Sequence, residues 1–213
     1  MVFSLKQKVK RIWRGIRESR AIITLGDISL KTWQEKFKEK GIYDCGLSKY
    51  IQKFSKNKDT DGASYWLRYN FGTGYRSNDF SMYLDTEFGF ILTMLEKDIA
   101  DTARLKERGL AAIGFNIEYG TIFIKQIQGK YGQAEVLKRF RWEKMLVAIV
   151  VDWAKKNRFR LVKIQKAEDN EYYNKNSNDD RRARLRMHYN VTAERSGFKL
   201  DKNNSVYILE LAA

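Results

Sequence analysis

Apolar residues recur every three or four positions along the first sixty residues, the spacing that places them on one face of a helix. Residues 4–20 carry such a stripe from Leu5 to Ile16, with lysines and arginines off the stripe. This pattern predicts a basic amphipathic helix. The same spacing predicts two further helices, over 29–40 and 46–55.

A polar, turn-forming segment over 55–62 predicts a loop after these helices. We therefore expect a helical, basic N-terminal region, 1–60, followed by a second domain, 61–213. The basic helix of the N-terminal region has two interpretations that the sequence leaves open. It lies on an anionic surface, or it docks on the rest of the protein by its apolar stripe.

The middle of the chain is rich in aromatic and apolar residues. Residues 64–71 are mostly aromatic and predict a strand, and a short strand is expected at 80–84. The apolar residues that follow fit helical spacing, with Thr86 as an N-cap and Gly109 at the far end. This segment predicts a long helix over 87–108.

The second half alternates strand and helix patterns. Two β-rich runs, 110–119 and 121–128, predict a hairpin that turns at Gly120. A broadly apolar run at 135–157 predicts a helix buried against a sheet, and 159–165 predicts a strand. The remaining predictions are an irregular stretch, a helix and a closing strand at 168–183, 184–196 and 205–211. This order predicts an α/β or α+β fold, a mixed sheet flanked by helices with a helical basic N-terminal extension.

Charge adds a preference for anionic partners. The chain has 213 residues and a formal net charge of +15. Residues 1–58 carry 15 basic and 5 acidic side chains, residues 59–120 carry 6 and 10, and residues 121–213 carry 20 and 11. Basic ends around an acidic middle indicate a polyanionic partner, such as nucleic acid, an anionic membrane surface or a phosphate-rich cofactor. A lysine-rich surface that maintains solubility gives the same composition, and both interpretations stay open.

Rare residue types exclude several kinds of chemistry. The one cysteine, Cys45, excludes an internal disulfide framework and a cysteine-rich zinc site, and it favours a reducing compartment. The one histidine, His188, excludes a metal centre built from several histidines. The chain has no run of about 18 apolar residues, so we expect no transmembrane segment. These features predict a cytoplasmic protein without a bound metal.

Three segments of the second half resemble a known superfamily. Trp153-Ala-Lys-Lys-Asn157 precedes the predicted strand 159–165, Asn170 follows that strand, and a helix from Tyr189 ends at Gly197-Phe198. Together they resemble the GNAT-type acyltransferase superfamily. The likeness covers residues 110–211. It implies a GNAT-like mixed sheet, acetyl-CoA or another acyl-CoA as cofactor, and either N-acyltransferase activity or a degenerate relative that keeps the fold.

The resemblance also implies a place for the pyrophosphate of the cofactor. The superfamily binds this group with a loop that reads Arg or Gln, two residues, Gly, one residue, then Gly or Ala, and with free N–H groups of the following helix. Gly129–Ala134 fits except at its first position, where Gln128 is one residue out of register. A second placement starts the helix near Arg139 and leaves 129–138 as an enlarged loop. The implied cofactor-binding residues are Gln128, Gly129, Lys130, Gly132, Ala134, Arg139 and Asn170.

Acyl transfer to an amine needs a base for the ammonium and an acid for the leaving thiolate. The acid in this superfamily is often a tyrosine four residues before the Gly-Phe glycine, a position that Ala193 occupies. Tyr189, one helical turn earlier, is the candidate acid if the helix is shifted. Glu118, on the strand beside the cofactor strand, is the candidate base. His188 is a further candidate base, although a single histidine on a helix is more often structural.

Four arginines within six residues form the densest basic segment, namely Arg181, Arg182, Arg184 and Arg186. Arginine suits bidentate contact with phosphate, and the preceding tyrosines suit stacking on bases. The alternative function is therefore a non-enzymatic, basic nucleic-acid-binding module. The same arginines fit two other interpretations, a solvated helix start or contacts with coenzyme A phosphates.

Overall fold

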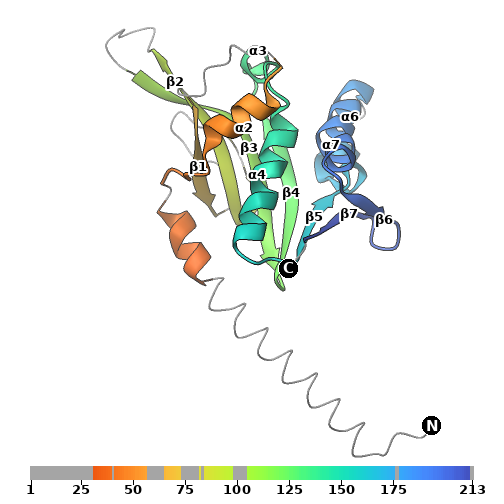
Figure 1. The fold of residues 1–213 in the computed structure, drawn as a ribbon. Coiled ribbons are helices and arrows are strands. Elements are labelled where there is room, and N and C mark those ends of the chain that lie inside the picture. The colour runs from red at the N-terminus through yellow and green to blue at the C-terminus, as the bar shows by residue number, and fades with distance from the viewer. Residues whose placement is uncertain are drawn as a thin grey trace, which may run out of the picture.

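The computed structural model describes residues 31–39, 41–56, 65–72, 82, 84–97, 105–175 and 178–211 (Figure 1). The predicted helix 4–20, most of the predicted loop 55–62 and part of the predicted strand 80–84 lie outside these residues. The described chain is a mixed α/β protein with a sheet flanked by helices, which confirms the predicted fold class.

One seven-stranded sheet forms the centre of the fold. Its strands are β1 (Tyr65–Phe71), β2 (Phe88–Lys97), β3 (Leu105–Glu118), β4 (Thr121–Gly129), β5 (Leu161–Gln165), β6 (Lys199–Asp201) and β7 (Val206–Glu210). They lie in the order β1-β2-β3-β4-β5-β7-β6, and β4 with β5 is the parallel pair among otherwise antiparallel neighbours in this sheet. The predicted strands at 64–71, 159–165 and 205–211 are confirmed, and β6 has no counterpart in the prediction.

The predicted helix over 87–108 is wrong, because β2 and the start of β3 occupy this segment. Phe88, Phe90 and Leu92 of β2 point into the main core, whereas Ile91 belongs to a small cluster on the other face. A strand buried on both faces carries a nearly continuous apolar run, which periodicity does not distinguish from a buried helix. Gly109, expected to end the helix, lies inside β3.

The hairpin of β3 and β4 is confirmed, and it turns at Tyr119 and Gly120, both with positive φ. Positive φ at both central residues gives the turn that matches the twist of a hairpin. The register shifts between Gly114 and Phe115, opposite which β4 has Lys125 as an extra residue. Such a bulge bends the strand locally.

Helices cover the sheet around a central helix. They are residues 31–38, α2 (Leu47–Phe54), α3 (Ala134–Leu137), α4 (Trp142–Lys156), α5 (Glu171–Lys175), α6 (Asp179–Arg186) and α7 (Thr192–Arg195), with a 3-10 turn η1 (Ala167–Asp169) and a π-helical segment η2 (Met187–Val191). Figure 1 shows α4 between α2 on one side and α6 with α7 on the other. The predicted helix 46–55 is confirmed, as is the described part of 29–40. The segment 168–183 is largely helical, so the prediction of an irregular stretch is wrong.

The predicted helix 135–157 is two helices, α3 and α4, because its backbone bonds to a distant segment between them. The N–H of Arg141 donates to the Phe54 carbonyl at 2.9 Å, and the N–H of Lys56 donates to the Arg139 carbonyl at 2.8 Å. Ser55 and Phe140 form the bridge between the same two stretches. These bonds join the end of α2 to the α3–α4 turn.

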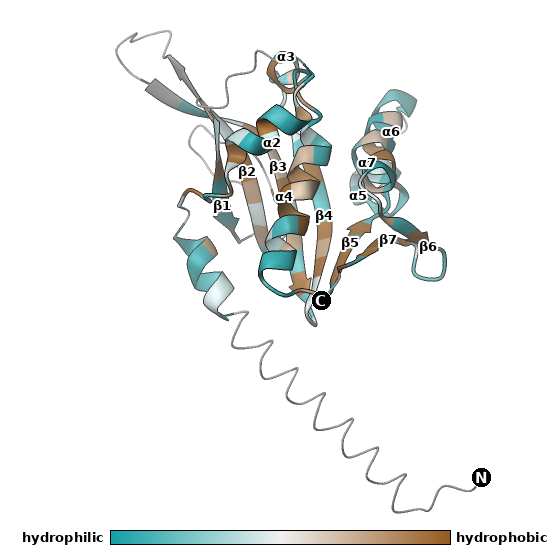
Figure 2. Ribbon diagram, in the orientation of Figure 1, coloured by the Kyte–Doolittle hydropathy of each residue, from teal (hydrophilic) through white to brown (hydrophobic). Residues whose placement is uncertain are grey.

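The core between the helices and the sheet is centred on Trp153 of α4. Aromatic rings surround it, with centroids 5.3–6.1 Å away, from Trp33, Phe37, Phe90, Phe115 and Phe159. Figure 2 shows hydrophobic residues along the strands and along α4. Phe37 and Ile51, which precede residue 60, are fully buried in this same core.

Candidate functional site

The parallel strands β4 and β5 part from each other at the centre of the sheet. They pair over four residues, from Thr121 with Leu161 to Ile124 with Ile164. Beyond this point β4 continues to Gly129, whereas β5 ends at Gln165 and turns into η1. Figure 1 shows β4 extending well past the end of β5. One edge of β4 therefore has no strand beside it after Ile124.

A pocket of about 730 Å³ lies at the end of β4. It is lined by Lys56, Gly129, Lys130, Tyr131, Gly132, Ala134, Leu137, Lys138, Phe140, Trp142, Glu143, Arg184 and His188. Four predicted cofactor-binding residues, Gly129, Lys130, Gly132 and Ala134, thus line one pocket together with Arg184. The structure brings the predicted phosphate loop and one predicted phosphate-binding arginine to the same place.

Three predicted cofactor-binding residues, Gln128, Arg139 and Asn170, are not among the residues that line the pocket. The Gln128 side chain accepts a hydrogen bond from Gln126 Nε2 at 3.0 Å. Arg139 is exposed on the turn between α3 and α4, where its carbonyl accepts from Lys56.

Two glycines shape the floor and the rim of the pocket. A Cβ at Gly129 would lie 3.0 Å from Leu137 Cδ1 and 3.4 Å from Trp142 Cζ2, so a side chain here would displace these two lining residues. Gly132 has a φ of +79°, a backbone conformation that favours glycine. The close approach at Gly129 gives a physical reason for glycine where the superfamily has Arg or Gln.

Positive charge dominates the pocket. Four lining side chains are cationic, namely Lys56, Lys130, Lys138 and Arg184, and Glu143 is the one carboxylate among the lining residues. Lys138 forms an ion pair with Glu135. Neither Lys56 nor Arg184 has a side-chain ion-pair partner among the described residues. The first turn of α4, which contributes Trp142 and Glu143, adds the positive end of a helix dipole. This arrangement attracts an anion.

His188 and Glu143 form a pair on the wall of the pocket. His188 Nδ1 lies 3.0 Å from Glu143 Oε1, and a carboxylate only accepts, so Nδ1 carries the hydrogen of this bond. The imidazole also packs against the Trp142 ring, with centroids 5.2 Å apart. In the neutral form of the ring, the other nitrogen is then the acceptor.

Tyr189, the candidate acid, lies beside the edge of β4 that β5 leaves. Its hydroxyl donates to the Lys125 carbonyl at 3.1 Å and accepts from the N–H of Ile127 and from Asn170 Nδ2, both at 3.2 Å. Burial raises the pKa of Tyr189 to about 12, so the phenol is protonated at neutral pH. Asn170 Oδ1 in turn accepts from the N–H of Tyr172 at 2.9 Å. Two predicted site residues, Tyr189 and Asn170, therefore meet directly.

Glu118, the candidate base, lies at the other end of β4 from the pocket. It ends β3 at the hairpin, is exposed, and forms an ion pair with Lys125 at 3.2 Å. Glu118 pairs with Thr121 across the hairpin. The strand from Thr121 to Gly129 rises over eight residues, which is roughly 26 Å. The structure does not bring Glu118 together with the phosphate loop.

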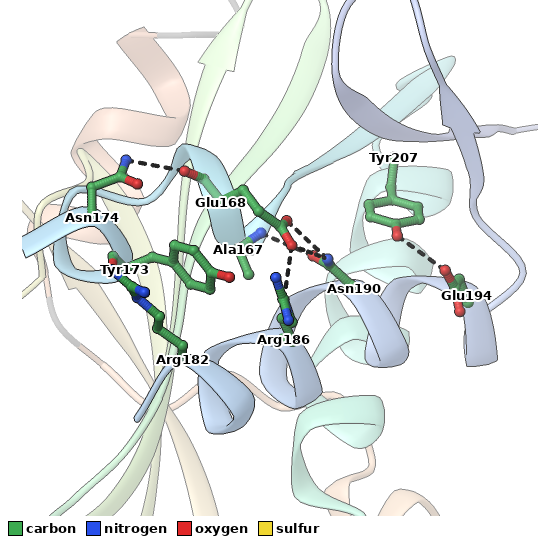
Figure 3. Close-up of polar contacts among 9 residues, drawn as sticks. All are labelled: Ala167, Glu168, Tyr173, Asn174, Arg182, Arg186, Asn190, Glu194 and Tyr207. Atoms are coloured by element: carbon green, nitrogen blue, oxygen red, sulfur yellow. Dashed lines mark hydrogen bonds and ion pairs between the residues drawn. The ribbon is translucent and has the colours of Figure 1, made fainter. Parts of the chain in front are cut away.

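The four arginines of α6 lie in different surroundings, and Figure 3 shows two of them, Arg182 and Arg186. The guanidinium groups of Arg182 and Arg186 lie 5.5 and 5.4 Å from the centroid of Tyr173. Arg186 Nε also donates to Glu168 Oε1 at 3.0 Å. The backbone N–H of Arg181 donates to the Asn178 side chain as part of the helix cap. Arg182 and Arg186 thus attach α6 to the segment after β5, whereas Arg184 lines the pocket.

Glu168 is the acidic centre of this attachment, and it gives a prediction for acid stability. Burial would raise its pKa, but hydrogen bonds from Asn190 and Arg186 lower the pKa below the ordinary value of 4.5. A lowered pKa stabilises the fold at neutral pH, and this stability is lost as the pH falls through the folded-state value. In urea unfolding at pH 6, Glu168→Gln is expected to have a lower free energy of unfolding than the wild type. At pH 4 the difference between the two free energies is expected to be smaller. An equal gap at both pH values would contradict this.

Sequence reasoning misses Lys56, Lys138, Trp142 and Glu143 as lining residues. Lys56 follows α2, more than seventy positions before the phosphate loop, and only tertiary packing places it there.

No protein-family model and no curated protein matches the chain. Within the described ranges, no group of His, Cys, Asp or Glu residues has an arrangement that could hold a metal ion. No helix of the described residues is long and apolar enough to cross a membrane.

Proposed function

We propose that this protein is a GNAT-type N-acyltransferase that binds acyl-CoA. The observation that carries the proposal is the cationic pocket at the end of β4, directly beyond the point where β4 parts from its parallel neighbour β5. The order of the strands and the buried helix that follows β4 also fit the resemblance in the sequence. The proposal applies equally to a degenerate relative that binds the cofactor without transferring the acyl group.

The residues of the pocket fit the phosphate groups of coenzyme A. Lys56 and Arg184 offer positive charge that no acidic side chain of the described chain neutralises. Arginine suits bidentate contact with phosphate oxygens, and lysine acts as a point charge. A Cβ at Gly132 would meet no atom within 4 Å, so the space beside this glycine is open to a ligand. Asn170 holds Tyr189 and the turn after β5, so its proposed part in cofactor binding is indirect.

Acyl transfer requires that the amine nitrogen attack the thioester carbonyl carbon and lose a proton to water or a base, that the C–S bond break, and that the thiolate receive a proton. Tyr189 is a protonated hydroxyl at the edge of β4 that β5 leaves, a place that suits a proton donor to the thiolate. His188, with an acceptor nitrogen beside the pocket, is closer to the phosphate loop than Glu118 is. We propose Tyr189 as the acid and assign no base.

Calorimetry with acetyl-CoA tests the proposal. Arg184→Ala and Lys56→Ala are each expected to weaken binding about tenfold, because each removes one charged contact to phosphate. Arg195→Ala on α7 and Lys155→Ala on α4 are matched controls, since both side chains are exposed and neither lines the pocket. No binding by the wild type at millimolar acetyl-CoA, or equal effects of the pocket and control variants, would overturn the proposal.

Nucleic-acid binding is the second candidate, and the net charge of +15 favours it. The structure engages Arg182 and Arg186 with Tyr173 and Glu168, so this arginine run does not form one continuous phosphate-binding surface. Titration with single-stranded RNA at two salt concentrations measures this function. Salt-dependent affinity would support it, because phosphate contacts release counterions, and its absence would argue against it.

A further inference from the structure

Three cationic residues lie side by side where the end of α2 meets the α3–α4 turn. The N–H of Lys56 donates to the Arg139 carbonyl at 2.8 Å, and the N–H of Arg141 donates to the Phe54 carbonyl at 2.9 Å. Figure 1 shows α2 and α3 together at one end of α4. Lys56, Arg139 and Arg141 are all exposed. Backbone bonds thus hold these three residues, the basic bridge, at one place on the surface.

The basic bridge has no counter-ion within the part of the chain that the structure describes. Like charges on facing residues repel each other, so the arrangement is unfavourable by itself. None of its three side chains forms an ion pair with a described residue. The helices α2, α3 and α4 contain three carboxylates, and each has another partner, namely Glu135 with Lys138, Glu143 with His188 and Asp152 with Tyr50. Any counter-ion therefore comes from outside the described residues.

An exposed aromatic ring lies on the rim of the adjoining pocket. Tyr131 is 101% exposed, so both faces of its ring are open to solvent, and it lines the pocket together with Lys56. Lysine and arginine suit the phosphates of nucleic acid, and an aromatic ring stacks on a base of any kind. A single strand exposes the faces of its bases, whereas a duplex covers them. The combination fits single-stranded nucleic acid better than an acidic peptide, which has carboxylates but no bases.

We propose that the basic bridge and Tyr131 form a binding site for single-stranded nucleic acid. Phosphate groups contact the basic bridge, and a base stacks on Tyr131. The site rests on the second candidate function, not on acyl transfer, and it lies apart from the arginine run of α6. Arg139 and Arg141 are not among the residues that line the pocket, so they serve nucleic acid alone. Lys56 is shared, and a bound strand competes with acyl-CoA for it.

Fluorescence anisotropy with a short strand of oligo(A) RNA tests the basic bridge. The double variant Arg139→Ala/Arg141→Ala keeps both backbone bonds and is expected to weaken RNA binding about tenfold at low salt. Each lost phosphate contact is also expected to reduce the magnitude of the slope of log affinity against log salt by about 0.7. Lys155→Ala/Arg195→Ala is the matched control, since it removes the same charge from exposed positions of α4 and α7. This control is expected to change RNA affinity by less than about threefold.

Tyr131→Ala separates stacking from charge. It is expected to weaken binding of the oligo(A) strand about tenfold and to leave the salt slope unchanged, because it removes a ring and no charge. The same strand paired with oligo(U) is expected to bind the wild type and Tyr131→Ala equally, since its bases are covered. Equal binding of the unpaired strand by both proteins would contradict the stacking.

Two results would overturn the site even if the wild type binds RNA. One is an equal RNA affinity of the Arg139→Ala/Arg141→Ala variant and its control, which would show that net charge alone attracts the strand. The other is a polyglutamate peptide that binds the wild type as tightly as the strand and loses affinity in the same double variant. The surface would then recognise charge without bases.

Calorimetry with acetyl-CoA distinguishes this site from the proposed cofactor pocket. The Arg139→Ala/Arg141→Ala variant is expected to bind acetyl-CoA like the wild type. A loss of acetyl-CoA affinity without a loss of RNA affinity would assign the two arginines to the cofactor and overturn the site. No RNA binding by the wild type would overturn the site and the second candidate function, and it would leave the acyltransferase proposal standing.

Discussion

Replacement of Trp153 by alanine is expected to lower the free energy of unfolding by about 3–5 kcal/mol, because it removes a large side chain from the centre of the core. Trp153 is 1% exposed. The centroid of its ring lies 5.5 Å from that of Phe115 on the sheet and 5.8 Å from that of Phe37 in the helix 31–38. These rings come from different elements, so they cannot move together to fill the cavity.

Urea unfolding followed by circular dichroism measures this effect. Trp153→Phe keeps one ring and is expected to lose less stability than the alanine variant. Lys155→Ala, exposed on the same helix, controls for the helix itself and is expected to change stability by less than about 0.5 kcal/mol. A loss below about 1 kcal/mol in Trp153→Ala would show that the ring cluster does not support the core.

Gly114→Ala is expected to lower the free energy of unfolding by about 1–3 kcal/mol through overpacking. A Cβ at Gly114 would overlap the hydroxyl of Thr86, a fully buried residue. That hydroxyl donates to the Phe88 carbonyl at 3.0 Å, so it cannot turn aside without losing the bond. The loop before β2 therefore lies against the sheet only because position 114 has no side chain.

A double-mutant cycle with Thr86→Ala separates this overlap from a general effect of alanine in a strand. In the Thr86→Ala background, Gly114→Ala is expected to cost much less than in the wild type. Gly41→Ala is the matched control, since a Cβ at Gly41 meets no atom within 4 Å. Equal losses at position 114 in both backgrounds would contradict the overlap.

The strands on either side of the hairpin were predictable because their pattern is local. Residues 110–119 and 121–128 each alternate or carry β-rich residues, and Gly120 marks the turn. The error over 87–108 has a physical source. Phe88, Phe90 and Ile91 are buried on two faces of a central strand, and a run without a polar face fits either kind of element.

Four residues of the predicted phosphate loop line one pocket in the structure, so the sequence located this surface, and its role in binding phosphate stays a prediction. The break between α3 and α4 lies near the second placement, which starts a helix near Arg139, although neither glycine nor proline marks residues 138–141. It arises from backbone bonds of Arg141 and Arg139 to the end of α2. Lys56 enters the pocket through the same bonds, so no local pattern could have identified it.

Those backbone bonds have a consequence for any shortened form of the protein. A chain that began at residue 61 would still contain every strand and the phosphate loop. It would lack Lys56, and the carbonyl of Arg139 and the N–H of Arg141 would lose their partners. The stability of the α3–α4 turn would then fall, and so would the cofactor affinity that the proposed function predicts, although the cut is far in sequence from both. A fragment chosen by the boundary near residue 60 would therefore be a poor sample in which to test the proposed function.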